Sequence, residues 1–484
     1  MPTARSTAPS SCSAASDAMA ATLDHLEALT HSLAGSVLHG GYVDSVSAGF
    51  YRVRGLEPHV ALNDAVWAES GGQRHWGKVI RIDPDAVIVA PYRSTRVLRR
   101  GDVVLAAGRV HAPRPNMAWL GRVLDALGEP IDGGGPIPVL PERRASARAV
   151  APLERARVDA PFRTGVKVAD VFTPLCYGQR IGIFAGSGVG KSTLLSMFAR
   201  ADAFDVAVIA LVGERSREVR EFLEDTIGPD QRARTVTVVA TSDESAMMRC
   251  SAPVMALEAA EYFRDRGMRV LVMIDSVTRY AHALREVGIA LGEPPIARGY
   301  PPSVFAALPQ LMERAGPGRE GSGSVTAIAT VLVDGDDHND PVADTMRGIL
   351  DGHLVLDRHI ADQGRFPAVD ILASLSRLAL RVWTEEQRLF VTELRGLVAR
   401  YEETREIRML GGWIRGADPA LDQAVELVPL IYEAMKQGPR DPQSLDPFIE
   451  LARRLKERQR QMDAPDAAKA NGAPAAGRSQ TPET

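Results

Sequence analysis

At 484 residues the chain is too long for one ordinary domain, so two or three units sharing a sizeable core are expected. Hydrophobic residues make up 45% of the sequence and charged residues 24%, which is the balance of a soluble globular protein. Lys and Arg number 57 against 61 for Asp and Glu, and the formal charge of −4 argues against nucleic acid as a partner and against an RNA-translocating ring.

The sequence also argues against a membrane-spanning or secreted protein. The longest apolar runs, such as Val206–Val212, fall well short of the roughly 18 residues that cross a bilayer. The N-terminus contains Asp17 and lacks the apolar core of a secretory signal. Cys12, Cys176 and Cys250 are too widely spaced for a disulfide framework or a paired metal site. A cytoplasmic location with reduced thiols is therefore expected.

The N-terminal part of the chain predicts a loose segment followed by a small β-domain. Residues 1–35 are expected to be disordered except for an amphipathic helix from Met19, which either docks on its own protein or binds a partner or a membrane surface. Residues 36–112 contain short β-rich pieces, including Val79–Ile82 and Val87–Val89. This pattern predicts a β-barrel.

Residues 113–388 alternate apolar strands with helical stretches. The strand candidates are Ile181–Phe184, Val206–Val212, Val236–Ala240, Val270–Ile274 and Val325–Val333. Such alternation predicts a mostly parallel sheet covered by helices. Residues 389–462 are expected to be helical, with Asp418-Pro419 and Asp446-Pro447 each starting a helix. Residues 463–484, rich in Ala, Pro, Ser and Gly, are expected to form a disordered tail.

A phosphate-binding loop is indicated between the first of these strands and the next helix. In such a loop glycines let backbone N–H groups turn toward phosphate oxygens, and the helix N-terminus adds the positive end of its dipole. Lys191 would reach the outer phosphates, and the Ser192 hydroxyl can ligate Mg²⁺. Ala185 stands where the usual pattern has Gly, and a flexible turn is the alternative. The candidate nucleotide-binding residues are Gly186, Ser187, Gly188, Val189, Gly190, Lys191, Ser192 and Thr193.

Two further strands end in carboxylates. Asp275 follows Val270–Ile274 and would lie at the carboxyl edge of the sheet, where it can hold a water on Mg²⁺ or else cap the next helix. Glu214 follows Val206–Val212 and could polarise the water that attacks the γ-phosphate, whereas alone it would read as part of a solvated loop. With the phosphate loop, these residues predict binding and hydrolysis of a nucleoside triphosphate with Mg²⁺.

Together these motifs resemble the catalytic subunits of rotary ATP synthases and, more closely, the flagellum-specific type III export ATPases. The linked motifs are Gly186–Ser192, Gly213–Glu218 and Ile274–Arg279. Ala185 itself is similar to the export branch, whose loop often reads A-G-S-G-V-G-K-S. Pro294–Phe305 and Gly335–Pro341 resemble the flagellar branch more than the virulence-injectisome branch. The resemblance covers residues 37–460.

The resemblance implies an α/β fold: a RecA-like P-loop ATPase core with an N-terminal β-barrel and a C-terminal helical domain. It further implies catalytic roles for Glu214, Lys191, Arg215 and Arg377, a metal site of Ser192, Asp275 and Glu218 that binds Mg²⁺ partly through water, and support from Arg279. Arg377 resembles the arginine finger that enters the neighbouring subunit's site, although a loop arginine is more often in a surface salt bridge.

The same resemblance implies an aromatic contact with the adenine base. Phe366 stands where the family places a ring against adenine, and ordinary core packing is the alternative. Trp413 is a poorer match for a second ring. Stacking adds apolar contact without reading the base, so modest selectivity for ATP over GTP is expected.

By this resemblance the chain forms a homohexamer that hydrolyses ATP for flagellar protein export. The implied partners are a stator-like regulator, a stalk protein, the export gate and chaperone–substrate complexes, with peripheral association at the cytoplasmic face of the inner membrane at the flagellar base. An injectisome ATPase is the main alternative. A rotary ATP synthase catalytic subunit should lack the Pro294–Phe305 segment, and a non-catalytic ring subunit should lack Glu214, so both are less favoured.

Overall fold

The computed structural model describes residues 39–47, 49–93, 98–108, 114–138, 150–333 and 340–463. The chain divides into two compact units, Met1–Ala112 and Pro113–Thr484. The expected helix from Met19 lies outside the described residues, as does the expected tail apart from Asp463. Among the described residues, no helix is both long and apolar enough to cross a membrane.

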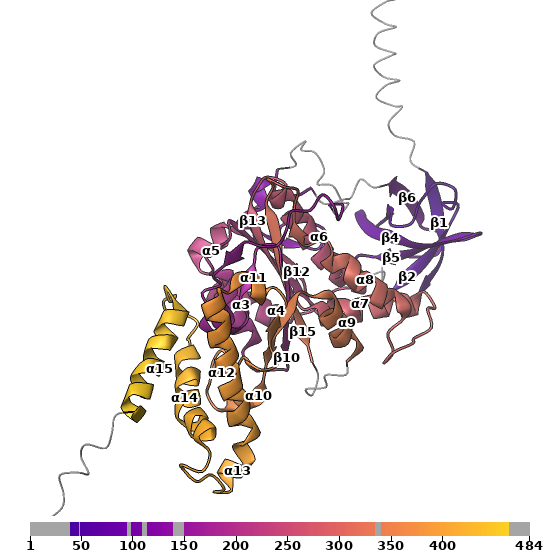
Figure 1. Cartoon of the computed structure of the whole chain (residues 1–484). Coiled ribbons are helices and arrows are strands. Elements are labelled where there is room, and N and C mark those ends of the chain that lie inside the picture. The colour runs from indigo at the N-terminus through magenta and orange to yellow at the C-terminus, as the bar shows by residue number, and fades with distance from the viewer. Residues whose placement is uncertain are drawn as a thin grey trace, which may run out of the picture. The chain divides into compact units, whose positions relative to one another are not determined.

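The first unit contains a closed antiparallel barrel in the strand order β1-β2-β5-β4-β3-β6 (Figure 1). Its strands are β1 (Gly40–Ser47), β2 (Phe50–Arg54), β3 (Ala65–Ser70), β4 (Gln73–Asp83), β5 (Ala86–Pro91) and β6 (Val103–Gly108). Inward side chains such as Val43, Tyr51 and Val66 form its core and are at most 1% exposed. The predicted barrel is confirmed, and the predicted pieces Val79–Ile82 and Val87–Val89 lie in β4 and β5.

The second unit is built on a sheet in the order β17-β16-β10-β15-β13-β11-β12-β7, with β14 beside β15. Neighbouring strands from β16 to β7 are parallel. The strands are β7 (Val123–Asp125), β10 (Arg180–Ala185), β11 (Val206–Val212), β12 (Thr235–Ala240), β13 (Arg269–Asp275), β14 (Gly316–Pro317), β15 (Ser324–Leu332), β16 (Gly352–Leu356) and β17 (Leu375–Ser376). The pair β8 (Pro161–Phe162) and β9 (Leu175–Cys176) forms a separate small sheet. The predicted parallel sheet is thus confirmed.

The central strands are continuous apolar runs because both faces of the sheet are covered. Every residue of β11 is buried. One face packs on α2, α3, α12 and α14 in a single hydrophobic cluster, while α6 packs across β11, β12 and β13. The parallel strands therefore end together at one edge of a buried sheet, and that edge is where the loops with chemistry emerge.

Several helices begin at polar capping residues, which accept hydrogen bonds from N–H groups of the first turn. Ser245 caps α6 and Ser276 caps α7. Asp418 caps α14 and Asp446 caps α15, each one residue before a proline, as predicted. The helices are η1 (Met117–Trp119), α2 (Lys167–Phe172), α3 (Lys191–Ala199), α4 (Ser216–Glu221), η2 (Phe222–Thr226), α5 (Pro229–Ala233), α6 (Ala246–Arg264), α7 (Val277–Ala290), α8 (Pro302–Met312), α9 (Pro341–Ile349), α10 (Arg358–Asp362), α11 (Ala379–Val382), α12 (Glu385–Glu403), α13 (Arg405–Met409), α14 (Pro419–Met435) and α15 (Pro447–Asp463).

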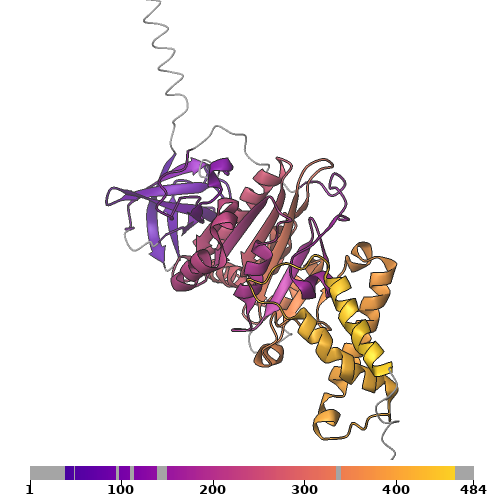
Figure 2. The ribbon, with the colours of Figure 1, turned by 90° about the vertical axis from the view of Figure 1, so that its left-hand side faces the viewer.

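The C-terminal helices α12, α14 and α15 lie side by side, coloured orange to yellow in Figure 2. The hydrophobic cluster that fills the sheet face continues into them, joining Phe172 of α2 to Leu394 of α12 and Ile431 of α14. The expected helical segment starting at 389 begins within α12, whose first residue is Glu385. The helices thus share a core with the sheet and belong to the same compact unit.

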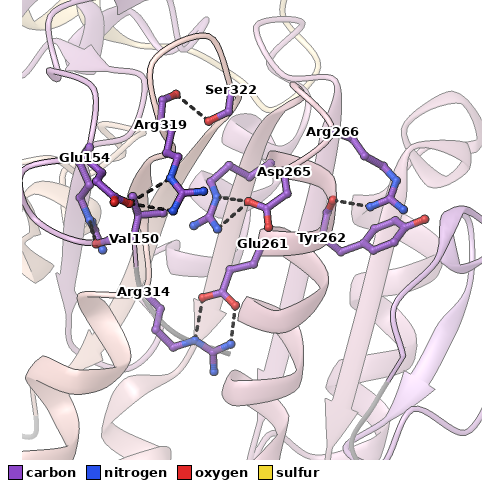
Figure 3. A network of polar contacts seen from close by, with 11 residues as sticks. Val150, Glu154, Glu261, Tyr262, Asp265, Arg266, Arg314, Arg319 and Ser322 are labelled. Atoms are coloured by element: carbon purple, nitrogen blue, oxygen red, sulfur yellow. Dashed lines mark hydrogen bonds and ion pairs between the residues drawn. The ribbon is translucent and has the colours of Figure 1, made fainter. Parts of the chain in front are cut away.

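Ion pairs tie the end of α6 to the chain that enters β15 (Figure 3). The Glu261 carboxylate is 1% exposed and accepts hydrogen bonds of 2.9 and 2.8 Å from the Arg314 guanidinium. Nearby, Arg319 pairs with Glu154 at 2.8 Å. A buried charge without a partner is costly, so the Glu261–Arg314 pair fixes the path of the chain before β15.

Gln437, which lies just beyond α14, joins the helical segment to the core. It is 5% exposed. Its side-chain oxygen accepts from the Lys167 backbone N–H at 2.9 Å, and its side-chain nitrogen donates to the Gly165 carbonyl at 2.8 Å. Its own backbone N–H donates to the Phe366 carbonyl at 2.9 Å. One residue therefore links α14, the start of α2 and the loop that carries Phe366.

Replacing this amide tests the link. Gln437→Ala leaves the partly buried Lys167 N–H group and Gly165 carbonyl without this partner, so the free energy of unfolding should fall by about 1–3 kcal/mol. Chemical denaturation followed by circular dichroism measures this change. Gln363→Ala removes an exposed glutamine and should change stability by less than about 0.5 kcal/mol. Equal effects of the two substitutions would show that the Gln437 contacts do not stabilise the fold.

Candidate active site

The predicted phosphate loop runs from the end of β10 to the start of α3. Gly188 and Gly190 have φ values of 77° and 92°, a region that favours glycine. Ala185 instead lies within β10, where Leu332 and Leu356 pair with it on either side, so this position does not need glycine. Val189 is buried, whereas Ser187, Ser192 and Thr193 are exposed. The loop thus has the strand, turn and helix that phosphate binding requires.

A cluster of opposite charges lies at the carboxyl edge of the sheet, beside the loop. The Lys191 ammonium Nζ lies 2.5 Å from Asp275 Oδ1 and 3.5 Å from Glu214 Oε1. The three side chains are 13%, 5% and 14% exposed, respectively. Burial raises the pKa of Glu214 to about 7, the Lys191 charge opposes this shift, and the Asp275 charge adds to it. The carboxylate is therefore poised near neutral pH, where a general base works best.

A cavity of about 230 Å³ opens on this cluster. Its lining residues are Ser192, Leu211, Glu214, Glu218, Val219, Glu221, Phe222 and Asp275. It therefore brings together the four predicted residues Ser192, Glu214, Glu218 and Asp275, which come from α3, the turn after β11, α4 and β13. These residues lie up to 83 positions apart in the sequence, and the parallel register of the sheet places them together.

The oxygen groups of this cavity fit Mg²⁺. Hydroxyl and carboxylate oxygens are the donors that Mg²⁺ takes, and it usually keeps several waters and binds one or two carboxylates plus substrate phosphates. Within the described ranges, no group of three or more His, Cys, Asp or Glu side chains forms a metal cage. The donor set therefore suits a metal that arrives with a phosphate ligand.

The two predicted arginines near this site are placed differently. Arg215 is 82% exposed and its Nη1 lies 3.8 Å from Glu218 Oε1, outside the lining of the cavity. The aliphatic carbons of Arg279 pack against Gly213, where a Cβ would lie only 3.0–3.3 Å from them. Gly213 also has a φ of 69°, so the turn that presents Glu214 is shaped by a glycine and by Arg279.

Phe366 lies beside the phosphate loop. It is 45% exposed, and a Cβ on Gly190 would lie 3.6 Å from its ring. Phe366 and Tyr432 line the same small hollow, and the Arg365 guanidinium lies 3.3 Å from the centre of the Tyr432 ring. Trp413 is not among the residues lining the hollow and donates its indole N–H to Asp422 at 2.9 Å. Tyr432, not Trp413, is thus the aromatic neighbour of Phe366.

Two polar residues beside the loop were not predicted from the sequence. Thr330 on β15 donates its hydroxyl to Asp275 Oδ1 at 2.7 Å. Arg358 at the start of α10 donates to the Ser187 carbonyl at 2.8 Å. Neither belongs to a motif with recognisable spacing, and only the fold brings them to the loop.

Arg377 is at the opposite edge of the sheet. It follows β17, and its backbone N–H donates to the carbonyl of Asp351, which precedes β16. Its side chain is exposed and donates to the Arg347 carbonyl at 3.1 Å. The strand β10 separates this edge from the phosphate loop by six residues, or about 20 Å. The structure therefore does not bring Arg377 together with the other predicted site residues of the same chain.

The position of Lys191 makes a test of nucleotide binding possible. A ligand that binds the folded state at 100 times its dissociation constant stabilises it by about 2.7 kcal/mol. Added ADP should therefore raise the thermal midpoint of the unaltered protein but not that of Lys191→Ala. Differential scanning fluorimetry with and without ADP measures both. Lys456→Ala, which alters an exposed lysine of α15, should keep the full response to ADP. A full response in Lys191→Ala would contradict the phosphate-binding role.

Known proteins match the chain over most of its length. Residues 165–376 match the family described as ATP synthase alpha/beta family, nucleotide-binding domain, and residues 383–454 match the T3SS EscN ATPase C-terminal domain. The flagellum-specific ATP synthase of Agrobacterium fabrum is 55% identical over 422 residues, which cover 87% of this chain and 89% of that protein. The type 3 secretion system ATPase of Xanthomonas euvesicatoria is 47% identical over 411 residues, covering 85% and 92%.

A solved structure agrees with these relatives. The assembled ATPase EscN from the type III secretion system of enteropathogenic E. coli is similar at a TM-score of 0.80 and 39% identity, over 86% of this chain and 99% of that chain. Both the sequence and the fold thus match along the barrel, the ATPase core and the helices. The chain therefore belongs to the family of flagellum-specific and type III secretion ATPases, P-loop enzymes that hydrolyse ATP.

Proposed function

We propose that this ATPase serves a flagellar protein-export apparatus and hydrolyses ATP at the cavity beside Lys191. The observation that carries the proposal is the meeting of Lys191, Glu214 and Asp275 with Ser192 at one edge of the sheet. The flagellar system is favoured because a flagellar relative is 55% identical, against 47% for the type 3 secretion relative. An injectisome ATPase is the alternative.

The residues of the cavity divide the chemistry between them. Binding of phosphate draws the Lys191 ammonium toward the phosphate oxygens, where its charge offsets theirs. Ser192, with Asp275 and Glu218 acting through waters, would hold Mg²⁺, which supplies further neutralisation of the phosphate charge. Glu214, freed from Lys191, orients the attacking water and accepts its proton, and the cavity of about 230 Å³ has room for several waters at about 30 Å³ each.

Other residues contribute binding and charge. Phe366, exposed beside Gly190, offers its ring to the adenine base, and Gly186 to Thr193 surround the phosphates. Arg215 reaches the γ-phosphate by turning its exposed side chain from Glu218 toward the cavity, and Arg279 keeps the Gly213 turn in shape. The barrel within 36–112, the core within 113–388 and the helices within 389–462 would act as three functional domains.

The ring is part of the same proposal. Arg377 lies about 20 Å from the phosphate loop of its own chain, across the length of β10, so as an arginine finger it would act on the site of a neighbouring copy. The relative EscN has been solved in assembled form and in complex with its central stalk EscO. A homohexamer with a stalk protein is the corresponding assembly here.

The remaining partners follow from the family. We infer that the ring binds a stator-like regulator, the export gate and chaperone–substrate complexes. We also infer that the ring is held at the cytoplasmic face of the inner membrane at the flagellar base. Two flagellar relatives at 55% identity support this setting. ATP and Mg²⁺ are the only small ligands that the proposal requires.

Glu214→Gln tests the catalytic role. The amide keeps the shape of the side chain but cannot accept a proton, so turnover should fall about 10²-fold or more while ADP affinity changes little. A coupled ATPase assay and fluorescent-ADP titration measure the two quantities. Glu224→Gln, which alters an exposed glutamate near the end of η2, should keep close to normal turnover and ADP affinity.

In the organism, cells carrying only Glu214→Gln should lack flagellar filaments. Near-normal turnover would end the catalytic assignment, and normal filaments would end the flagellar one.

Mixing two inactive variants tests whether Arg377 acts across the interface. Arg377→Ala should lower turnover by about 10³-fold or more. In rings assembled from Glu214→Gln and Arg377→Ala subunits, some interfaces combine an intact Glu214 with an intact Arg377, so activity should reappear. Arg381→Ala, at a neighbouring exposed arginine, should retain activity alone. If mixed rings stay as inactive as their components, Arg377 does not complete a neighbour's site.

A further inference from the structure

The strand β15 lies between the two strands that carry the best-defined site residues. The sheet order is β10-β15-β13, so β15 separates the strand of the phosphate loop from the strand that ends in Asp275. Ile183 of β10 pairs with Thr330, and Ile274 of β13 pairs with Ala329. One step further along this parallel register, Thr330 stands beside Asp275. The sequence shows no motif on β15, although its position in the sheet is central.

Thr330 makes a single well-defined contact with the site. Its Oγ1 donates to Asp275 Oδ1 at 2.7 Å and lies 3.3 Å from the Ile274 carbonyl. Thr330 is 0% exposed and Asp275 is 4% exposed, so water does not compete for this hydrogen bond. The same oxygen, Oδ1, also receives the Lys191 ammonium at 2.5 Å. Two donors thus share one oxygen of the carboxylate.

The second carboxylate oxygen is left for other ligands. Within the described part of the chain, no hydrogen bond reaches Asp275 Oδ2. A carboxylate rotates easily about its terminal bond, because that torsion is broad and roughly two-fold. The side chain of Thr330, in contrast, is stiff because it is branched at Cβ, and it sits on a central strand. Thr330 therefore supplies the rotational restraint that Asp275 lacks.

We propose that Thr330 is a positioning residue that fixes the Asp275 carboxylate for binding hydrated Mg²⁺. It holds Oδ1, so that Oδ2 accepts a hydrogen bond from a metal-bound water in the cavity. When phosphate draws Lys191 away, Thr330 remains as the donor that keeps the carboxylate in place. The inference rests on the proposed role of Asp275. It goes beyond that role because it makes the affinity for Mg²⁺ depend on Thr330, which lies on a strand without catalytic groups.

Thr330→Val tests this role, because valine keeps the shape of the side chain and replaces the hydroxyl with a methyl group that cannot donate a hydrogen bond. The Mg²⁺ concentration for half-maximal ATPase activity should rise about tenfold, as for loss of an outer-shell partner of a metal ligand. The affinity for fluorescent ADP measured in EDTA should not change, whereas the gain in affinity on adding Mg²⁺ should shrink by a similar factor. Thr330→Ser, which restores the hydroxyl, should return both quantities toward normal.

Thr326→Val is the matched control. Thr326 lies on the same strand, is also 0% exposed, and its Oγ1 accepts from the Gly178 N–H at 2.9 Å, near the opposite edge of the sheet. Its loss should lower the thermal midpoint without changing the Mg²⁺ dependence. If Thr330→Val behaves like Thr326→Val, its hydroxyl serves only the stability of the sheet and the inference is wrong.

Asp275→Asn separates failure of the inference from failure of the proposed function. A shifted Mg²⁺ dependence in Asp275→Asn with an unshifted one in Thr330→Val would leave Asp275 in its role and overturn only the part given to Thr330. A normal Mg²⁺ dependence in Asp275→Asn would remove Asp275 from the metal site, and the inference about Thr330 with it. Shifts in both variants, with recovery in Thr330→Ser, support the positioning role.

Discussion

The ion pair of Lys191 with Asp275 and Glu214 is the interaction on which the site depends. Two carboxylates with 5% and 14% exposure cannot keep their charge at low cost unless a cation lies beside them. Lys191 provides that cation at 2.5 and 3.5 Å. In the proposed mechanism, phosphate competes for the same ammonium group. Binding of the nucleotide must therefore be coupled to a new source of positive charge for the carboxylates, which is the physical reason to expect nucleotide and metal to bind together.

This charge balance also sets the protonation of Glu214. Burial raises its pKa to about 7, and Lys191 is the neighbour that opposes the shift. Withdrawal of Lys191 toward phosphate therefore makes Glu214 more basic unless another cation replaces it. In the proposed mechanism, the basicity of the group that polarises water therefore depends in part on the position of the group that binds phosphate.

Much of the fold could be predicted from local sequence patterns. Continuous apolar runs identified the central strands, and Asp-Pro pairs identified the starts of α14 and α15, since both signals lie within a few neighbouring residues. The phosphate loop, the carboxylate after β11 and the carboxylate at the end of β13 could be predicted for the same reason. Roles of individual residues were harder to predict. Ala185 looked like a departure from the motif because its strand conformation is visible only in the structure.

The residues that the sequence could not identify are those whose partners are distant along the chain. Thr330 meets Asp275 across 55 positions, and Tyr432 shares a hollow with Phe366 across a longer separation. A single threonine in an apolar strand gives no functional signal, because threonine is common in β-strands. For Arg215 the motif was informative but the conformation was not predictable. The motif indicates a contact with the γ-phosphate, whereas the side chain is 82% exposed and lies beside Glu218.

The parallel sheet explains why a ring is the natural assembly for this site. Its strands deliver the phosphate loop, Glu214 and Asp275 to one edge, and the Glu261–Arg314 pair and Arg377 lie toward the other. A chain with complementary halves of a site on opposite edges can complete the site only by head-to-tail contact with another copy. Such a contact is heterologous, and it must close into a ring or continue as a filament. With Arg377 in its proposed role as an arginine finger, closure gives every copy one complete site, and the separation of Arg377 from Lys191 by the length of β10 makes the assembly part of the active site.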